Sequence, residues 1–257
     1  MRPYRGIPQT EVLPLPLEGG GLRVSISRDA RVPHSAAVEA AWSKLVAANP
    51  KYFDGSILSV LHLPHELDHA GTSKSEIQNE ILVRRDRFSR LAVQPAVSTG
   101  VRILSVTGVL LSKDSTGREF VLLGKRGRST RIYGGMWELG PSGGLQDPPP
   151  AVTSLDHEAI FANLADEIEE EVGLQLHRGE AVCLTRDHKA MSDDIVFICN
   201  AGPLEVASSE AHAANWEYEE VRWLPTDSLA PFDADQESNI IPPTRALFRA
   251  LGWIDWS

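Results

Sequence analysis

Three glutamates, Glu167, Glu170 and Glu171, lie close together in the acidic stretch DEIEEE at residues 166–171. Successive residues of an α-helix are rotated by ~100°, so these three carboxylates would share one face of a helix. Carboxylates held this close repel one another, and hard divalent cations such as Mg²⁺ or Mn²⁺ prefer such oxygen ligands. The stretch is therefore a candidate metal site. The competing interpretation is an acidic helix face exposed to solvent.

The residues around the glutamates predict the helix that would hold them. We expect it at about residues 156–172, with Gly173 at its C-cap. Apolar residues recur at helical spacing and form a stripe beside the acidic one: Phe161, Leu164, Ile168 and Val172. This stripe would bind the helix to a β-sheet, so the carboxylates would lie at the rim of the core.

The spacing of these residues resembles the motif of the Nudix hydrolase family, GX5EX7REUXEEXGU, in which U is a bulky aliphatic residue. Glu158 and residues 166–174 match the second half of this motif in register. Residues 137–144 (WELGPSGG) resemble the family's approach to the motif, and residues 220–224 (EVRWL) resemble a later strand. The motif lies in the loop–helix setting that it requires.

Two features depart from the family motif. Thirteen residues separate Gly144 from Glu158 where the motif has five, so we expect an insertion at residues 146–156. Asp166 stands where the motif has an arginine, which in the family helps to hold the loop and the helix together. All three main carboxylates are retained, and we interpret the departures as an altered architecture. A degenerate binding protein is the alternative.

The resemblance implies a metal-dependent hydrolase of nucleoside diphosphates linked to another group, with Mg²⁺ as the cofactor and Mn²⁺ as the alternative. Glu167 and Glu171 would be the surest metal ligands. Glu170 would be a further ligand or, through a bound water, a base, which makes Glu170 and Glu171 the catalytic candidates. Glu158 would support the motif. In this family a carboxylate from a later loop often joins the site, and three residues are candidates here: Glu210, Glu217 and Glu219.

The N-terminal half resembles the branch of the family that hydrolyses UDP-sugars in mammals. The resemblance rests on short matches in the same order along the chain: Trp42, Asn49-Pro50, Phe53-Asp54, Arg85-Asp86, Phe88 and His157-Glu158. It implies hydrolysis of UDP-glucose or UDP-galactose to UMP and a sugar 1-phosphate. One alternative is the same reaction on ADP-ribose, a dinucleotide or a nucleoside triphosphate. The other is a Nudix-like sensor that binds nucleotides without turnover.

Six residues are candidates for binding the substrate. Phe53 would stack on a base or serve as a core aromatic, and Asp54 would bind uridine or ribose or cap the backbone. Arginine can bind phosphate through two parallel hydrogen bonds, although charges at a strand end often only face solvent. Paired glycines allow a ligand to approach the backbone, although they are also common in turns. The arginines and glycines concerned are Arg126, Arg128, Gly143 and Gly144.

The remaining pattern predicts an α/β (α+β) chain in two parts. The resemblance implies that residues 1–97 form an α+β extension that contributes to the nucleotide site, and that residues 98–257 form a Nudix domain with a mixed sheet sandwiched between helices. In the extension we expect an extended leader at residues 1–21, a helix at residues 35–49, and strands at residues 56–63 and 80–84. In the domain we expect a hairpin of residues 101–113 and 118–126, an irregular run at 134–150, strands at 181–185, 195–199 and 221–224, and a last helix at 244–251.

Composition limits the classes of partner. The 257 residues include 25 Lys and Arg against 35 Asp and Glu, a net charge of −10, which disfavours nucleic acid and anionic membranes. The resemblance implies a small nucleotide as the partner. Two cysteines, Cys183 and Cys199, are too few for a disulfide scaffold or a zinc site. No secretory signal and no apolar run of ~20 residues is found, so we expect a cytoplasmic protein.

Overall fold

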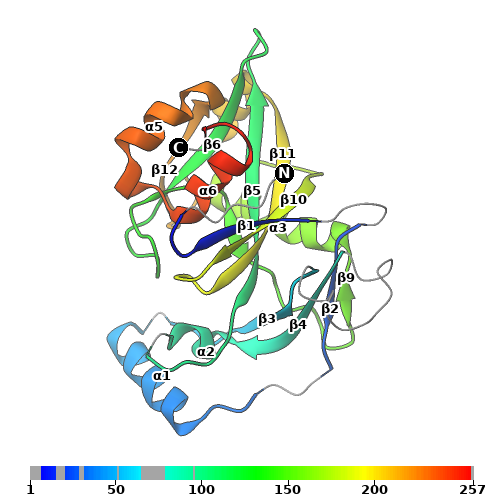
Figure 1. The fold of residues 1–257 in the computed structure, drawn as a ribbon, viewed down its shortest axis with the longest axis vertical. Helices are drawn as coiled ribbons and strands as arrows, with labels where there is room; N and C mark the ends of the chain where they lie inside the picture. Colours follow the sequence, from blue (N-terminus) through cyan, green and yellow to red (C-terminus); the bar gives the residue numbers. More distant parts are fainter. Residues whose placement is uncertain are drawn as a thin grey trace.

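The computed structural model describes residues 7–15, 21–28, 32–50, 52–64, 79–94 and 96–255. Its strands form one mixed, 12-stranded sheet with helices on both faces (Figure 1). The strands are β1 (Thr10–Pro14), β2 (Arg23–Ile26), β3 (Ser56–His62), β4 (Glu80–Arg87), β5 (Ile103–Lys113), β6 (Glu119–Arg126), β7 (Trp137–Leu139), β8 (Ser142–Gly144), β9 (Ser154–Leu155), β10 (Glu180–Asp187), β11 (Ser192–Pro203) and β12 (Tyr218–Pro225).

The sheet follows the order β1-β10-β11-β5-β3-β4-β2-β9. Strand β5 is its centre, because it also pairs with β6 and β8, and β6 in turn pairs with β7 and β12. The long pairing of β5 with β11 is parallel, whereas β5 with β6 and β10 with β11 are antiparallel. The mixed α/β class expected from the sequence is thus confirmed.

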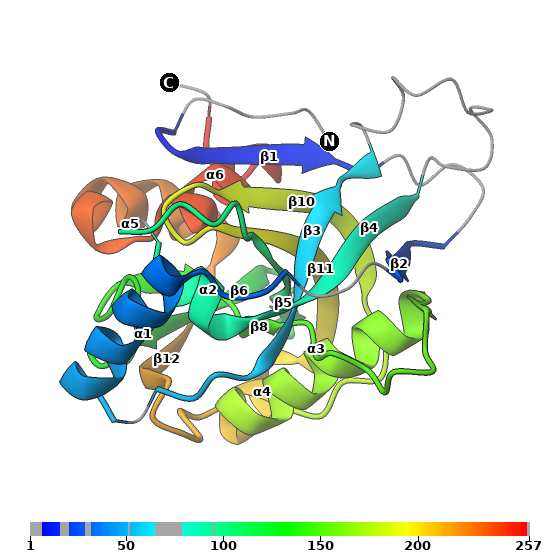
Figure 2. The ribbon, with the colours of Figure 1, turned by 90° about the horizontal axis from the view of Figure 1, so that it is seen from below.

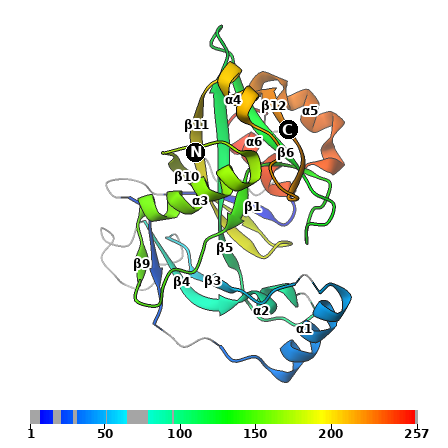
Figure 3. The same cartoon turned by 180° about the vertical axis from the view of Figure 1, so that it is seen from behind.

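Helices cover both faces of the sheet. Helices α3 and α4 lie on one face and α5 and α6 on the other (Figure 2), and α3 crosses the sheet beside β5 (Figure 3). Each face has its own apolar cluster, one around Leu164 and Phe197 and one around Leu247 and Phe248. The helices are α1 (Ala36–Ala48), α2 (Phe88–Ala92), α3 (His157–Val172), α4 (Leu204–Glu210), α5 (Leu229–Asp235) and α6 (Pro242–Ala250), with 3-10 turns at Thr226–Ser228 and Glu237–Asn239.

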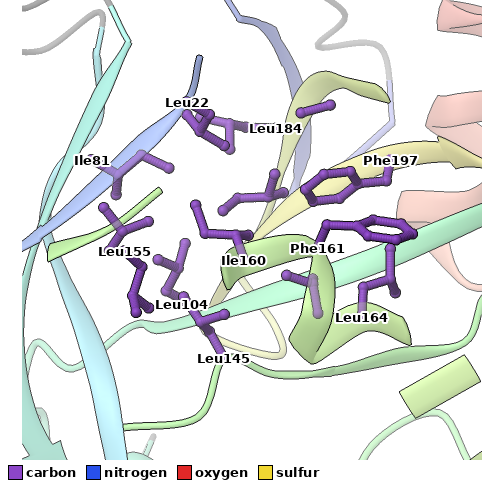
Figure 4. Close-up of a cluster of buried hydrophobic side chains, with 14 of the residues drawn as sticks. Leu22, Ile81, Leu104, Leu145, Leu155, Ile160, Phe161, Leu164, Leu184 and Phe197 are labelled. Atoms are coloured by element: carbon purple, nitrogen blue, oxygen red, sulfur yellow. The ribbon is translucent and has the colours of Figure 1, made fainter. Parts of the chain in front are cut away.

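The N-terminal part joins the same sheet. Strand β3 pairs with β4 and also with β5, where Ser59 lies opposite Ile103. The apolar core is continuous across this junction, because Leu22 and Ile81 of the N-terminal part lie near Leu155 and Ile160 in one cluster (Figure 4). The division at residue 97 stays a prediction.

Local signals placed several elements correctly. Ser35 caps α1, Asp156 caps α3, and Gly173 ends α3 with a φ of 75°. The hairpin of β5 and β6 is also confirmed, and its turn contains Gly117 at a φ of 84°. Among described residues no helix is long and apolar enough to cross a membrane.

Two expectations were wrong. The described part of the expected leader at residues 1–21 contains β1, which pairs with β10 through residues such as Val12 and Leu13, both buried. Its proline, Pro14, is tolerated because it ends a strand at the edge of the sheet. The run at residues 134–150 is not wholly irregular, since it contains the short strands β7 and β8, joined through a cis Gly140–Pro141 peptide.

Candidate active site

Helix α3 determines which glutamates face the protein. Its apolar stripe is buried against the sheet, with Ile168 fully buried. Glu171 lies beside this stripe and is only 2% exposed, and Glu167, one turn earlier, is partly buried. Glu170 is exposed. The three predicted carboxylates are therefore not equivalent, and only two of them enter the body of the protein.

The carboxyl group of Glu167 lies directly against the backbone of Gly143 in β8. A Cβ atom at Gly143 would overlap all three carboxyl atoms of Glu167. Only glycine therefore lets the helix bring this carboxylate so close to the strand. The sequence predicted that a ligand approaches Gly143 closely; in the structure a side chain of α3 makes the close approach, and the role of Gly143 in binding substrate stays a prediction.

Two further carboxylates that come from other elements meet those of α3. Burial and the neighbouring Glu217 raise the pKa of Glu171, to which Glu138 and Glu167 also contribute, and Glu171 forms a side-chain hydrogen bond with Glu217. A hydrogen bond between two carboxyl groups requires a proton on one of them. Burial, and then Glu217 and Glu170, raises the pKa of Glu167 to about 7. We call Glu138, Glu167, Glu171 and Glu217 the carboxylate cluster.

Glu138 is fixed by an arginine and a tyrosine. Arg126 Nη1 donates to both carboxylate oxygens of Glu138, at 2.6 and 2.7 Å, and the Tyr218 hydroxyl donates to Oε1 at 2.9 Å. The Tyr218 side chain contacts Gly124 and Gly140 so closely that a Cβ atom at either glycine would overlap it. The pair Arg126–Glu138 is thus held in one orientation beside the α3 carboxylates.

A cavity of about 180 Å³ lies beside this group. Arg126 lines it, and its Nε atom is buried with no hydrogen-bond partner among the described residues. A buried donor without a partner is costly, so this atom is a candidate donor to a ligand. The cavity also brings together several other polar residues and the two predicted glycines: Ser105, Arg131, Tyr133, Glu138, Gly143, Gly144, Asp187 and Asp194.

The other predicted acids lie outside the carboxylate cluster. Glu158 is exposed in the first turn of α3, ~14 Å along the helix from Glu167. Glu210 is exposed at the end of α4, and Glu219 pairs with Arg128. Of the three candidates from the later loop, only Glu217 therefore interacts with α3.

The remaining substrate candidates are not in the cavity. Phe53 is 81% exposed, so its interpretation as a core aromatic was wrong. Asp54 accepts hydrogen bonds from the Ser89 backbone at 2.8 Å and from Arg87 Nε at 2.7 Å, which is the backbone-capping role. The Arg128 side chain is 83% exposed, with its Nε 3.5 Å from Glu219. None of these side chains lines the cavity.

The inserted loop, residues 146–156, is held by the N-terminal part of the chain. Arg85 of β4 donates from Nε to Asp147 at 2.7 Å and from Nη2 to three backbone oxygens, those of Pro148, Pro149 and Val152, at 3.0–3.2 Å. The end of the loop pairs as β9 with β2. Asp166, at the position of the motif arginine, is exposed. A different arginine therefore anchors the loop that leads into α3.

The carboxylate cluster offers the oxygen donors that Mg²⁺ prefers. Within the part of the chain that the structure describes, no three His, Cys, Asp or Glu side chains are arranged to hold a metal ion by themselves. Mg²⁺ rarely uses such a cage, since it takes one or two carboxylates, waters and the phosphates of a substrate. Glu167 and Glu171 fit that pattern, because a cation would also offset the burial and the repulsion that together raise their pKa values.

No protein-family model and no curated protein matches the sequence. Solved structures of Nudix hydrolases share part of the fold. One from Alicyclobacillus acidocaldarius matches over 60% of this chain and 92% of its own, with 16% identity and a TM-score of 0.44. RenU, a Nudix hydrolase from M. smegmatis, matches over 58% and 83%, with 20% identity and a TM-score of 0.40. The Ap4A hydrolase of C. elegans matches over 59% and 99%, with 13% identity and a TM-score of 0.37.

Proposed function

We propose that this chain is a metal-dependent hydrolase of the Nudix type that cleaves a nucleoside diphosphate linked to a second group. The observation that carries the proposal is the carboxylate cluster, in which Glu167, Glu171, Glu138 and Glu217 converge from three separate segments beside one cavity. A diphosphate is itself anionic and could not approach this cluster without a cation. The cluster therefore supports a reaction in which Mg²⁺, or Mn²⁺, lies between protein and substrate.

Glu167 and Glu171 would hold the metal from one side of α3. The bound metal would neutralise phosphate oxygens and lower the pKa of the attacking water. Glu217, which hydrogen-bonds to Glu171, would lie where it could accept the proton that the water loses on attacking phosphorus. The P–O bond of the diphosphate bridge then breaks, and the leaving phosphate keeps the bridging oxygen. Glu170, exposed one residue before Glu171, is the other candidate base.

Arg126 would contact the phosphates directly. Its Nη1 is used by Glu138, whereas Nε has no partner among the described residues and the side chain lines the cavity. The ion pair with Glu138 fixes the plane of the guanidinium, so Nε is oriented before a ligand arrives. Such a donor can stabilise charge that develops on a phosphate oxygen during the reaction.

The first substrate to test is UDP-glucose or UDP-galactose, which the resemblance in the N-terminal half favours. ADP-ribose, dinucleotides and nucleoside triphosphates belong in the same test, because a fold does not determine the base that is recognised. Among the structural neighbours, one from C. elegans is an Ap4A hydrolase. A nucleotide sensor without turnover is the non-enzymatic alternative.

Phosphorus NMR of the purified full-length chain tests the proposal. UDP-glucose, ADP-ribose, Ap4A and a nucleoside triphosphate would each be incubated with Mg²⁺, with Mn²⁺ and with excess chelator. We expect UMP and glucose 1-phosphate to appear from UDP-glucose only when the metal is present. Hydrolysis of a different member of the panel would support the proposed reaction and identify a different substrate. Binding without any hydrolysis in the presence of either metal would overturn the proposal of an enzyme and favour a nucleotide sensor.

A further inference from the structure

Strand β11 carries two adjacent aspartates in opposite environments. Neighbouring residues of a strand point to opposite faces of the sheet. Asp193 is fully buried and paired with Arg102 at 2.9 Å and Arg186 at 2.7 Å. Asp194 lines the cavity of the candidate active site, and among the described residues it forms no ion pair. Only the first of these aspartates is neutralised by the protein itself.

The surroundings of Asp194 are polar, and no cation among the described residues forms an ion pair with it, although Arg126 and Arg131 line the same cavity. The hydroxyls of Ser192 and Ser105 hydrogen-bond to it, and Thr185 Oγ1 lies 3.3 Å from Oδ2. Burial, and then the charge of Asp187, raises the pKa of Asp194 to about 7. A desolvated carboxylate without a cation is costly to retain, and such groups gather at functional sites. The cavity wall thus presents a hydrogen-bond acceptor that the protein itself does not neutralise.

The sheet register gives the distance from Asp194 to the carboxylate cluster. Asp194 lies opposite Ser105 on β5, and Ser105 lies opposite Gly144 on β8. Neighbouring strands are ~4.8 Å apart, so Asp194 and Gly144 are separated by ~10 Å. Gly143, the next residue of β8, contacts the Glu167 carboxyl. Gly143 and Gly144 face opposite sides of β8, but both line the same cavity as Arg126, Glu138 and Asp194. A ligand with its phosphates beside Arg126 and Glu138 would therefore reach Asp194 with the group attached to those phosphates.

The charge of the cavity wall around Asp194 determines which group of the ligand can bind there. Asp187, also in the cavity wall, accepts a hydrogen bond from the Tyr133 hydroxyl at 2.8 Å and interacts with the charge of Arg131, whereas Asp194 forms no ion pair among the described residues. A carboxylate without an ion pair disfavours a phosphate beside it and favours neutral donors such as an N–H or a hydroxyl. We propose that Asp194, supported by Ser105, binds the neutral hydrogen-bond-donating group of the substrate, a nucleobase N–H edge or sugar hydroxyls. This inference rests on the proposed function and orients the substrate within the cavity.

Binding to a variant that cannot turn over tests the subsite. Calorimetry with Mg²⁺ would compare Glu171→Gln with the double variant Glu171→Gln, Asp194→Asn for UDP-glucose, ADP-ribose and inorganic pyrophosphate. Losing a charged acceptor should weaken binding of the nucleotide-linked ligands ~10- to 100-fold. Binding of pyrophosphate, which lacks the neutral group, should stay unchanged. Asp235→Asn is the matched control, because Asp235 is exposed on α5.

Two product arms distinguish the nucleobase from the sugar. If Asp194 binds the base, Asp194→Asn weakens the binding of UMP and leaves the binding of glucose 1-phosphate unchanged. If it binds the sugar, the pattern is reversed. Ser105→Ala should weaken the binding of the same ligand, by a smaller factor. Circular dichroism and the Tm of each variant would show that the fold is retained.

The outcomes separate this subsite from the reaction itself. If the wild-type protein hydrolyses a member of the panel and Asp194→Asn changes neither its KM nor its Kd, the subsite is overturned and the reaction stands. If Asp194→Asn weakens binding of nucleotides that the wild-type protein never hydrolyses, the subsite stands and the reaction is overturned. If pyrophosphate loses as much affinity as UDP-glucose, the proposed orientation is wrong. If wild-type protein binds neither UDP-glucose nor ADP-ribose, both proposals are overturned.

Discussion

The carboxylate cluster and the C-terminal helices both bury acidic side chains, with opposite results. In the C-terminal helices Asp233, which is 5% exposed, receives hydrogen bonds from Arg245 at 2.7 Å and Arg249 at 2.9 Å. Burial alone would raise the pKa of Asp233, but these arginines outweigh it and lower the pKa. In the carboxylate cluster, burial and like charges raise the pKa values of Glu167 and Glu171.

The difference separates acids that hold the fold from acids that act on something else. A buried acid with two arginines is a completed interaction, and removing one partner leaves the others uncompensated. A group of buried acids with one arginine is incomplete and stabilises the protein only when a cation or a proton joins it. Substitutions in the two regions should therefore separate activity from stability.

Glu171→Gln is expected to have the largest effect. The amide keeps the shape of the side chain but loses the anionic metal ligand, so kcat should fall by ~10³-fold. Stability should be retained or should increase, because a buried charge without a cation is removed. Phosphorus NMR would give the rate and urea unfolding the stability. Glu169→Gln is the matched control, since Glu169 is exposed on the same helix; an equal loss in this control would contradict the assignment.

Asp233→Asn should show the reverse behaviour. The substitution leaves Arg245 and Arg249 without their shared carboxylate, and we expect a loss of ~3 kcal/mol in the free energy of unfolding. The rate of hydrolysis, measured well below the Tm, should not change. Urea unfolding monitored by circular dichroism gives the free energy, with Asp235→Asn as the exposed control. A stable Asp233→Asn variant with reduced kcat would show that the comparison between the two regions is wrong.

Arg85→Ala should affect activity through the inserted loop. It removes the contacts with Asp147 and with the backbone oxygens of the loop, and small displacements of catalytic groups are costly. We expect kcat to fall ~10-fold. Arg118→Ala is the control, because it removes an exposed pair with Asp227, which contributes little. If Arg85→Ala lowers the Tm and leaves kcat unchanged, Arg85 serves stability alone.

The smallest effect expected is a pH dependence of stability in metal-free protein. The pKa values of Glu167 and Asp194 are about 7 in the folded chain, against an ordinary value of ~4 when unfolded. Between these values the folded state binds more protons, so the Tm should fall as the pH rises from ~4 to ~7. Asp233 has a lowered pKa, so its contribution is already complete in this window and is lost only at lower pH.

Added Mg²⁺ sharpens that measurement. The cation binds the ionised carboxylates, so it should raise the Tm more at pH 8 than at pH 5. Scanning fluorimetry with and without Mg²⁺ gives both numbers, and Glu167→Gln should reduce the difference between them. Equal stabilisation at both pH values would show that the metal binds elsewhere.

Helix α3 was predictable because its signals are local. The apolar stripe, the cap at Asp156 and the glycine at residue 173 all lie within or next to the helix. The carboxylates Glu167 and Glu171 follow from the same periodicity. The sequence did not predict that Glu171 is buried while Glu170 is exposed, because this difference depends on how far the helix is rotated against the sheet.

The partners of α3 were harder to predict because they come from distant segments. Glu217 was one of three candidates, and only the course of the loop before β12 selects it. Glu138 lies in the WELG run without a helical or metal-binding pattern, and Arg85 reaches the inserted loop from β4. Asp194 resembles any polar residue of a strand. A signal for it exists only in the pair Asp193-Asp194, whose two members must face opposite sides of the sheet.

The pairing of β1 with β10 has a consequence for folding order. Thr10 lies opposite Asp187 and Pro14 opposite Cys183, so β1 emerges from the ribosome well before β10 and completes its hydrogen bonds only after β10 has been made. Helix α6, later still, then packs near β1. Contacts between such distant segments slow folding, and an unpaired strand exposes its backbone to other chains meanwhile. Strand β1 is thus synthesised long before the elements that hold it in place.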